Sequence, residues 1–231
     1  VEANRYLLKI GPKSRFDFNY QPLANLIKSE WVSVEYPETY YKDGNKNAGY
    51  LRDEVYAFFI RWVYDTGDKS ASYHIPGRAA VAYNGILENA DYADANSFNG
   101  DTKLFETINT ATVIPQGGGQ IIASGNMAYW QCSERYPADK PEIWNSSEYC
   151  WSHETSPDYD LCGLPIRHHK FPDNGLSPQT NHFVKKPDGT YHIRLMGVRF
   201  KNITLPKDND GYDIEGIVGY EILRGSRIGN K

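Results

Sequence analysis

The run Glu54–Tyr64, with the sequence EVYAFFIRWVY, constrains the fold more than any other part of the chain. Successive side chains of a β-strand point to opposite faces of its sheet. Here both alternating sets are mostly apolar, and Arg61 is the charged residue within them. Strands of this composition are typical of sheets that are covered on both faces. We therefore predict a β-strand that the rest of the chain covers from both sides.

Turn residues directly after this run predict a β-hairpin. The sequence Asp65-Thr66-Gly67-Asp68 follows it, and Gly67 can adopt the positive φ that a tight turn requires. The next stretch, Lys69–Ile75, alternates apolar and polar residues and ends at Pro76-Gly77. Such alternation is typical of a strand with one face in solvent. We therefore expect the two runs to pair.

A second hairpin is predicted to join residues 183–184 to residues 190–195. The connecting residues are Lys185-Lys186-Pro187-Asp188-Gly189. They suit a turn because proline presets φ and glycine accepts the left-handed conformation. The apolar residues of the second strand change phase after Leu195. Gly197 is therefore expected to form a β-bulge that shifts the register.

The last apolar run, Ile217–Arg224, reads IVGYEILR and follows Leu205-Pro206 and an Asp- and Gly-rich loop. This order resembles the B and C strands of a fibronectin type III or related immunoglobulin-like sandwich. Helical periodicity is limited to the short stretch Pro22–Ile27. We therefore predict a mainly β fold with immunoglobulin- or fibronectin-III-like sandwich elements, a long loop-rich insertion and little helix.

Between the two hairpins lies a long irregular stretch rich in Asn, Asp, Gly, Ser and Pro. Its aromatic and apolar content is too high for a disordered linker. Short strands are expected within it, at residues 119–124 and 127–131. We predict three segments. The first is an N-terminal segment that packs on the β-domain (1–48), and the second is a sandwich-like domain that contains both hairpins (49–78 with 181–231). The third is an irregular β-rich insertion (79–180).

Charge and hydropathy exclude two classes of partner. The chain has 231 residues, and its 29 Asp and Glu residues outnumber its 25 Lys and Arg residues. The basic excess that is typical of nucleic-acid binders is therefore missing. The most apolar run, Val55–Tyr64, is about half of the ~18 residues that a membrane-spanning helix needs. We predict no membrane segment and no specific nucleic-acid binding.

Cysteine and histidine residues cluster in the second half of the chain. Cys150-x-x-His153 has a plausible spacing for a pair of zinc ligands, and Cys162 could be a third ligand. The sequence contains no CxxC pair, so the signal is weak. Two other interpretations stay open: a Cys150–Cys162 disulfide, and buried free thiols. Apart from this weak zinc hypothesis, we predict no metal site and no cofactor.

No catalytic motif emerges, since the chain has no G-x-S-x-G, no H-E-x-x-H and no P-loop. We therefore predict that the chain is not an enzyme. Its tryptophans could instead form a binding platform or a protein-contact surface, although such residues more often build a local core. The candidate interface residues are Trp130, Trp144, Trp151, His168, His169 and Phe171.

Four phrases in the chain suggest a family. They begin with GYLRDEVYAFFIRWVYDTGDKSASYHIPGR and continue with AYWQCSERYP, CGLPIRHHKFPD and GYEILRGSR. Together they resemble the large stabilisation or muzzle protein of crAss-like and related Bacteroidetes-infecting tailed phages, which is similar in role to a tail nozzle. The resemblance implies a non-enzymatic structural component of the virion, located in the tail or neck.

The same resemblance implies contacts with other virion proteins and a homo-oligomeric ring. Family members are far longer, and a sandwich would be incomplete at Lys231, so we expect the chain to be one segment of a longer protein. Two alternatives remain. One is an extracellular β-sandwich module that binds carbohydrate or a host surface, and the other is a zinc-stabilised domain or zinc enzyme.

Overall fold

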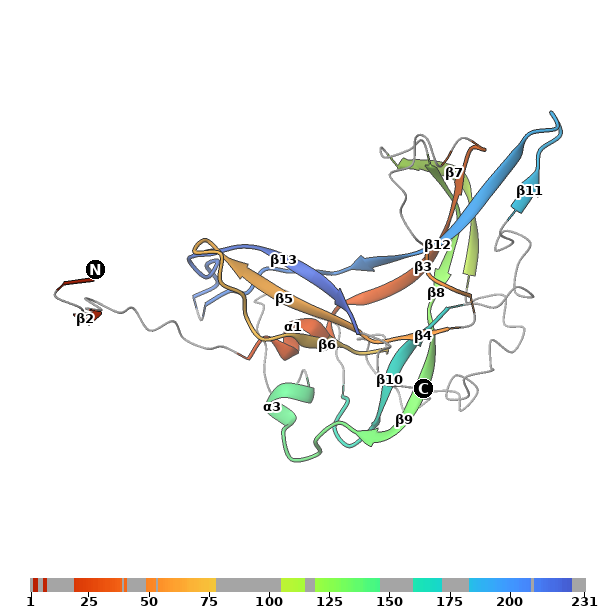
Figure 1. Ribbon diagram of the computed structural model, residues 1–231. Helices are drawn as coiled ribbons and strands as arrows, with labels where there is room; N and C mark the ends of the chain where they lie inside the picture. Colours follow the sequence, from red (N-terminus) through yellow and green to blue (C-terminus); the bar gives the residue numbers. More distant parts are fainter. Residues whose placement is uncertain are drawn as a thin grey trace.

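Antiparallel strands dominate the computed structural model of the chain (Figure 1). The structure describes residues 2–3, 6–7, 19–38, 40, 49–52, 54–77, 105–114, 119–145, 160–171, 183–208 and 210–225. Two short helices accompany the strands in this part of the chain, α1 (Gln21–Asn25) and α3 (Pro141–Trp144). The prediction of a mainly β fold with little helix is therefore confirmed. The finer resemblance to a fibronectin-like sandwich stays a prediction.

The largest sheet has five strands in the order β11-β12-β3-β8-β7. Its strands are β3 (Lys28–Tyr36), β7 (Phe105–Ile114), β8 (Gly119–Asn126), β11 (Phe183–Lys185) and β12 (Tyr191–Lys201). The pairing of β3 with β12 runs without a break from Tyr36 opposite Ile193 to Lys28 opposite Lys201. Residues that are distant in sequence thus form the centre of the fold.

Two three-stranded sheets lie beside it, with the orders β13-β5-β6 and β4-β10-β9, and a separate two-stranded ribbon pairs β1 with β2. A backbone hydrogen bond connects the two three-stranded sheets, because Gly77, which follows β6, donates to Arg167 of β10 at 3.0 Å. The remaining strands are β1 (Glu2–Ala3), β2 (Tyr6–Leu7), β4 (Val55–Tyr56), β5 (Phe58–Tyr64), β6 (Tyr73–Ile75), β9 (Ala128–Arg135), β10 (Pro165–Lys170) and β13 (Ile217–Arg224).

Both predicted hairpins are confirmed. β5 pairs with β6, and Gly67 in their connection has a φ of 84°. β11 pairs with β12 through a turn in which Gly189 has a φ of 90°. The short helix and the strands expected at 119–124, 127–131 and 217–224 are also present. Local turn chemistry therefore located these elements correctly.

The predicted bulge at Gly197 is wrong. The register of β12 against β3 continues through this residue. The apolar pattern changes phase there because the two faces of the sheet contact different cores. Ile193 and Leu195 pack against one buried cluster, whereas Met196 belongs to the other. Glycine is required for another reason, since a Cβ at position 197 would lie 2.9 Å from Cγ2 of Val32.

The prediction that β5 is covered on both faces holds for one face only. Phe58, Ile60 and Trp62 are each at most 1% exposed. The alternating residues, which include Phe59 and Arg61, are half-buried. Arg61 keeps its charge at the surface, where it pairs with Glu221 of β13 at 2.6 Å. The second face of the strand is thus a partly solvated one.

The sheets do not follow the predicted segment boundaries. β3 comes from the N-terminal segment and lies between β12, from the predicted sandwich-like domain, and β8, from the predicted insertion. All six residues from Trp31 to Tyr36 are buried. The division into 1–48, 49–78 with 181–231, and 79–180 stays a prediction, but strands from all three ranges build one sheet.

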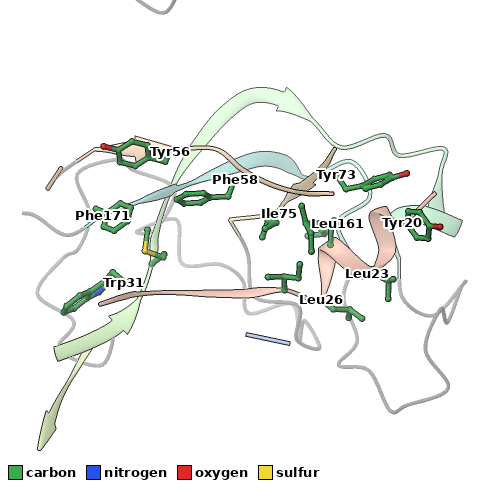
Figure 2. Close-up of a cluster of buried hydrophobic side chains, with 14 of the residues drawn as sticks. Tyr20, Leu23, Leu26, Trp31, Tyr56, Phe58, Tyr73, Ile75, Leu161 and Phe171 are labelled. Carbon is green, nitrogen blue, oxygen red and sulfur yellow. The ribbon is translucent and has the colours of Figure 1, made fainter. Parts of the chain in front are cut away.

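The main core lies in a sandwich-like arrangement between β3 and the strands β4 to β6, with α1 at one end (Figure 2). Its fully buried large side chains include Trp31, Phe58, Trp62 and Phe171. A second, smaller core covers the opposite face of β3 and contains Val32, Val34, Tyr36, Tyr40 and Ile121. In the part of the chain described here, no helix is long and apolar enough to cross a membrane.

Candidate functional site

Strand β10 directs its two adjacent histidines to opposite faces, as the alternation of a strand requires. His169 lies opposite Tyr56 and Tyr129 in the ladders and is 0% exposed. His168 lies opposite Trp130 of β9 on the other face and is half-buried. One histidine therefore belongs to the core, and the other belongs to an outer surface.

The outer surface is a group of four rings, called here the Trp130 face: Trp130, His168, His74 and Phe59. The rings of Trp130 and His168 are nearly parallel, at 5°, with centroids 6.5 Å apart. His74 of β6 reaches His168 through an Nε2···Nδ1 hydrogen bond of 3.3 Å, and Phe59 contacts His74. Trp130 is 40% exposed, so this face presents its indole ring to solvent, whereas the ring of His74 stands at 87° to that of His168.

The histidines of this region are neutral at neutral pH. Burial, followed by the neighbouring His168, lowers the pKa of His74 to about 4. Burial also lowers the pKa of His168, while Glu134 opposes the change. The hydrogen bond between the two imidazoles fits this state, because a neutral imidazole has one donor and one acceptor nitrogen. The Trp130 face is therefore an uncharged surface of polar and aromatic groups.

His169 is held in an apolar environment. Its ring lies 5.3 Å from the ring of Phe58 and 6.2 Å from that of Tyr129. Neither ring nitrogen has a hydrogen-bond partner in the described part of the chain. Burial, followed by the nearby His74 and His168, lowers the pKa of His169 to about 3. This residue has no surface available for contact with another chain, and neither does Phe171, which is also 0% exposed.

The remaining tryptophans differ from Trp130. Trp144 is half-buried, and its ring lies 4.6 Å from that of Tyr136, which is 2% exposed. Trp144 thus packs against the main core. Trp151 lies outside the described residues. Of the six candidate interface residues, the structure brings Trp130 and His168 together on one surface and places Trp144, His169 and Phe171 in or against the core.

The zinc hypothesis is not supported by the described residues, among which no three His, Cys, Asp or Glu side chains gather as a metal site. Cys150 and His153 lie outside that part of the chain, so the hypothesis itself stays a prediction. The Cys150–Cys162 disulfide is wrong, because Cys162 has a free thiol. Burial and then Asp160 raise the pKa of Cys162 to about 11, which keeps this thiol protonated.

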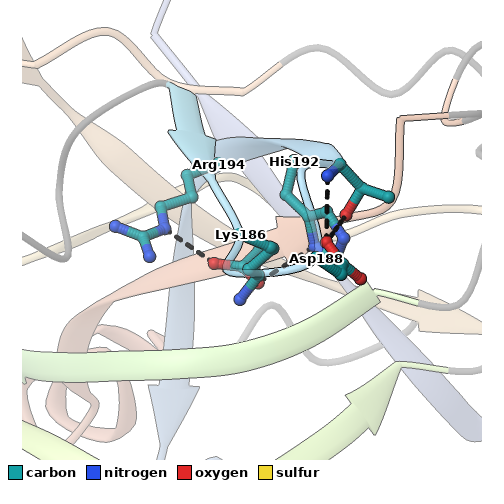
Figure 3. Close-up of polar contacts among 6 residues, drawn as sticks. Lys186, Asp188, His192 and Arg194 are labelled. Carbon is teal, nitrogen blue, oxygen red and sulfur yellow. Dashed lines mark hydrogen bonds and ion pairs between the residues drawn. The ribbon is translucent and has the colours of Figure 1, made fainter.

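An ion-pair network that the sequence did not indicate lies at the base of the β11–β12 hairpin (Figure 3). Glu35 of β3 is 6% exposed and accepts hydrogen bonds from Arg194 at 2.8 Å and from His192 at 3.1 Å, and it pairs with Lys186. Burial alone would raise the pKa of Glu35, but the hydrogen bonds from Lys186 and Arg194 outweigh it and lower the pKa. The network ties the hairpin to the central strand.

Two exposed apolar patches lie elsewhere on the surface. The hairpin patch consists of Phe183 and Tyr191, which are 70% and 51% exposed. The β13 patch consists of Val218 and Tyr220, which are 65% and 47% exposed. β13 pairs with β5 on one side and has no other strand partner among the described residues. Figure 1 shows β13 and β11, which carry residues of the two patches, far apart in the molecule.

Comparison with known proteins identifies no relative of this chain. The sequence matches no protein-family model, and searches of curated proteins and of solved structures find no similar protein.

Acidification is expected to destabilise the fold through the buried histidines. An unfolded histidine has a pKa of about 6.5, whereas His169 and His74 have values of about 3 and about 4 in the fold. Below the unfolded value, the unfolded chain binds protons that the folded chain does not, so the free energy of unfolding falls as the pH decreases. Urea titrations at several pH values between about 7 and 5 should show this loss. This pH range lies above the one in which most carboxylates titrate.

His169→Phe should make the loss with acid smaller, because phenylalanine suits the apolar site and does not titrate. His192→Gln is the control, since His192 lies in the separate Glu35 network. A pH dependence that is equally steep in wild type and His169→Phe would contradict the prediction.

Glu35→Gln should destabilise the fold, because it leaves Arg194 and Lys186 without their carboxylate. Breaking a buried ion pair costs several kcal/mol, and the partial exposure of Lys186 reduces that cost, so we expect a loss of about 2 kcal/mol in the free energy of unfolding. Chemical denaturation measures it. Glu221→Gln is the matched control, because Glu221 also binds two cations but at the surface. An equal loss in both variants would contradict a special role for Glu35.

Proposed function

We propose that the chain is a non-enzymatic structural component of a tailed-phage virion, in the tail or neck, where copies associate in a ring. Two observations support the proposal. The first is the set of sequence phrases that resembles the stabilisation or muzzle protein of crAss-like phages. The second, which carries the structural part of the argument, is the presence of two different exposed apolar patches, on strands that lie far apart.

Ring formation requires contacts between two different surfaces of each subunit. A head-to-tail contact repeats around a rotation axis and closes when the rotation divides a full turn. The hairpin patch and the β13 patch meet this requirement, because they differ in residues and lie on different strands. In the proposed assembly, the hairpin patch of one copy packs on the β13 patch of the next.

The β13 patch has a second property that suits assembly. Natural proteins usually protect the outer edge of a sheet with charge, proline or a covering segment, because an open edge can pair with another chain. The exposed side chains of β13 are Val218, Tyr220 and Arg224, so one charge and a register shift beside Val218 accompany two apolar residues. Two apolar residues on an outer strand favour contact with a neighbouring polypeptide over exposure to water.

Assembly can be tested by measuring mass as a function of concentration with light scattering. Wild type is expected to form a closed oligomer, whereas Phe183→Ser in the hairpin patch and Val218→Lys in the β13 patch should each prevent it. An equimolar mixture of the two variants retains one intact pair of surfaces. It should therefore form heterodimers and no larger species, which distinguishes a head-to-tail contact from a symmetric one.

Trp130→Ala is the control for this experiment, because Trp130 is exposed but belongs to neither patch. It should assemble as wild type does. A chain that stays monomeric at its highest soluble concentration, or heterodimers that fail to form in the mixture, would contradict the proposed contact.

A second candidate function is carbohydrate binding by the Trp130 face. The observation that favours it is the exposed ring of Trp130. The ring of His168 stacks against it, and His168 shares a hydrogen bond with His74. Flat aromatic rings with polar groups beside them suit contact with the apolar face of a sugar. Under this proposal the chain is an extracellular module that recognises glycans or a host surface.

A glycan-array screen tests this candidate. Binding should be lost in Trp130→Ala and retained in Trp144→Phe, because Trp144 packs against Tyr136 and does not belong to the Trp130 face. Retention of all glycan signals in Trp130→Ala would exclude the Trp130 face as the binding surface.

A further inference from the structure

Arg52 has an unusual environment for a charged side chain. Its three side-chain nitrogens, Nε, Nη1 and Nη2, each expose less than 1 Å², and none has a hydrogen-bond partner among the residues that the structure describes. A guanidinium has five N–H donors and cannot lose its charge in a protein. Burying such a group without an acceptor is costly, so native proteins nearly always pair it. The arrangement therefore leaves the donors of Arg52 in need of an oxygen acceptor.

The backbone around Arg52 is held in place by specific contacts. Tyr50 donates a backbone hydrogen bond to Met196 at 2.9 Å in an antiparallel bridge. Leu51 donates from its backbone to the hydroxyl of Tyr56 at 3.2 Å. Since the bridge is antiparallel, the residues that follow Tyr50 run alongside β12 in the direction from Met196 to Arg194. The position of Arg52 thus follows from the pairing of the strands.

A second guanidinium lies close to the first. Continuing the antiparallel bridge between Tyr50 and Met196 by two residues places Arg52 opposite Arg194. Burial and then the positive charge of Arg194 both lower the pKa of Arg52. The carboxylate of Glu35 is engaged elsewhere, because it pairs with Lys186, His192 and Arg194. Glu54, two residues along the chain, accepts a hydrogen bond from Tyr56 at 2.8 Å. In the described part of the chain, positive charge therefore exceeds negative charge around Arg52.

We propose that Arg52, with Arg194 beside it, forms a binding site for a carboxylate or a similarly compact oxyanion. The planar fork of a guanidinium matches the two oxygens of a carboxylate or phosphate, and the charge strengthens both hydrogen bonds. The neighbouring Leu51 is 52% exposed, so solvent lies one residue away. The inference does not depend on the virion role proposed above.

Thermal unfolding in sodium phosphate and in sodium chloride, at equal ionic strength and neutral pH, tests the site. An anion that binds only the folded chain raises the unfolding temperature. Phosphate also stabilises proteins in general, so the variant Arg52→Met supplies the reference. We expect phosphate to raise the midpoint of wild type more than that of Arg52→Met. Arg52→Lys should lie between them, because it keeps the charge and loses the fork.

Arg135→Gln is the matched control. Arg135 is exposed and donates to the backbone oxygen of Gly163, so its replacement should leave the phosphate response unchanged. In chloride alone, Arg52→Met should be at least as stable as wild type, because it replaces a buried unpaired charge with an apolar side chain of similar length. Equal phosphate responses in wild type and Arg52→Met, or a less stable Arg52→Met in chloride, would overturn the inference.

The source of the anion is distinguished by titration calorimetry with two probes. One is inorganic phosphate, and the other is a capped Gly-Glu-Gly peptide, with the capped Gly-Gln-Gly peptide as its control. Binding of phosphate alone indicates a small-ion site, and binding of the Glu peptide but not the Gln peptide indicates a site for an acidic side chain. In either case the heat of binding should disappear in Arg52→Met. A heat of binding that persists in this variant would overturn the inference.

Discussion

The pairing of β3 with β12 is the interaction on which the rest of the structure depends. Its register is unbroken over the nine residues of β3, and it joins the N-terminal part of the chain to a strand that lies more than 150 residues later. Because both faces of β3 are buried, one strand separates the main core from the smaller core around Tyr36 and Ile121. The close approach at Gly197 and Val32 then fixes how tightly the two strands pack. Losing this pairing would expose both cores at once.

Charged side chains set the register of that pairing. Glu35 lies opposite Arg194 and Glu30 lies opposite Arg199, and each pair is also joined by a salt bridge. A shift by one residue would move every side chain to the opposite face and separate both pairs. Apolar residues on both faces provide little discrimination between registers by themselves, since either set can be buried. The polar residues of β3 therefore provide specificity, whereas its apolar residues provide most of the driving force.

Turn chemistry made the hairpins predictable from sequence, because Gly67 and Gly189 serve a local backbone need. The sequence does carry a signal for β3, since Val32, Val34 and Tyr36 alternate with Ser33 and Glu35, but no turn marks it as part of a hairpin because its partners β12 and β8 lie far away in sequence. The same limit applies to the site. His168 and His169 are adjacent, so the sequence marked both, but the register of β10 decides which one is buried. Arg52 and the Glu35 network gave no local signal, since each depends on contacts with β12.

The Glu35 network also bears on how the hairpin patch could serve an assembly. Association is costly when a binding element must first become ordered, and an element that is rigid beforehand avoids that cost. The hairpin is short, and Phe183 and Tyr191 at its surface receive little packing from the body of the molecule. Lys186, His192 and Arg194 anchor it to β3 through one buried carboxylate. β13 is likewise held by its ladder with β5. Both proposed contact surfaces are therefore fixed by pairing within the chain, which leaves most of the free energy of their burial for association.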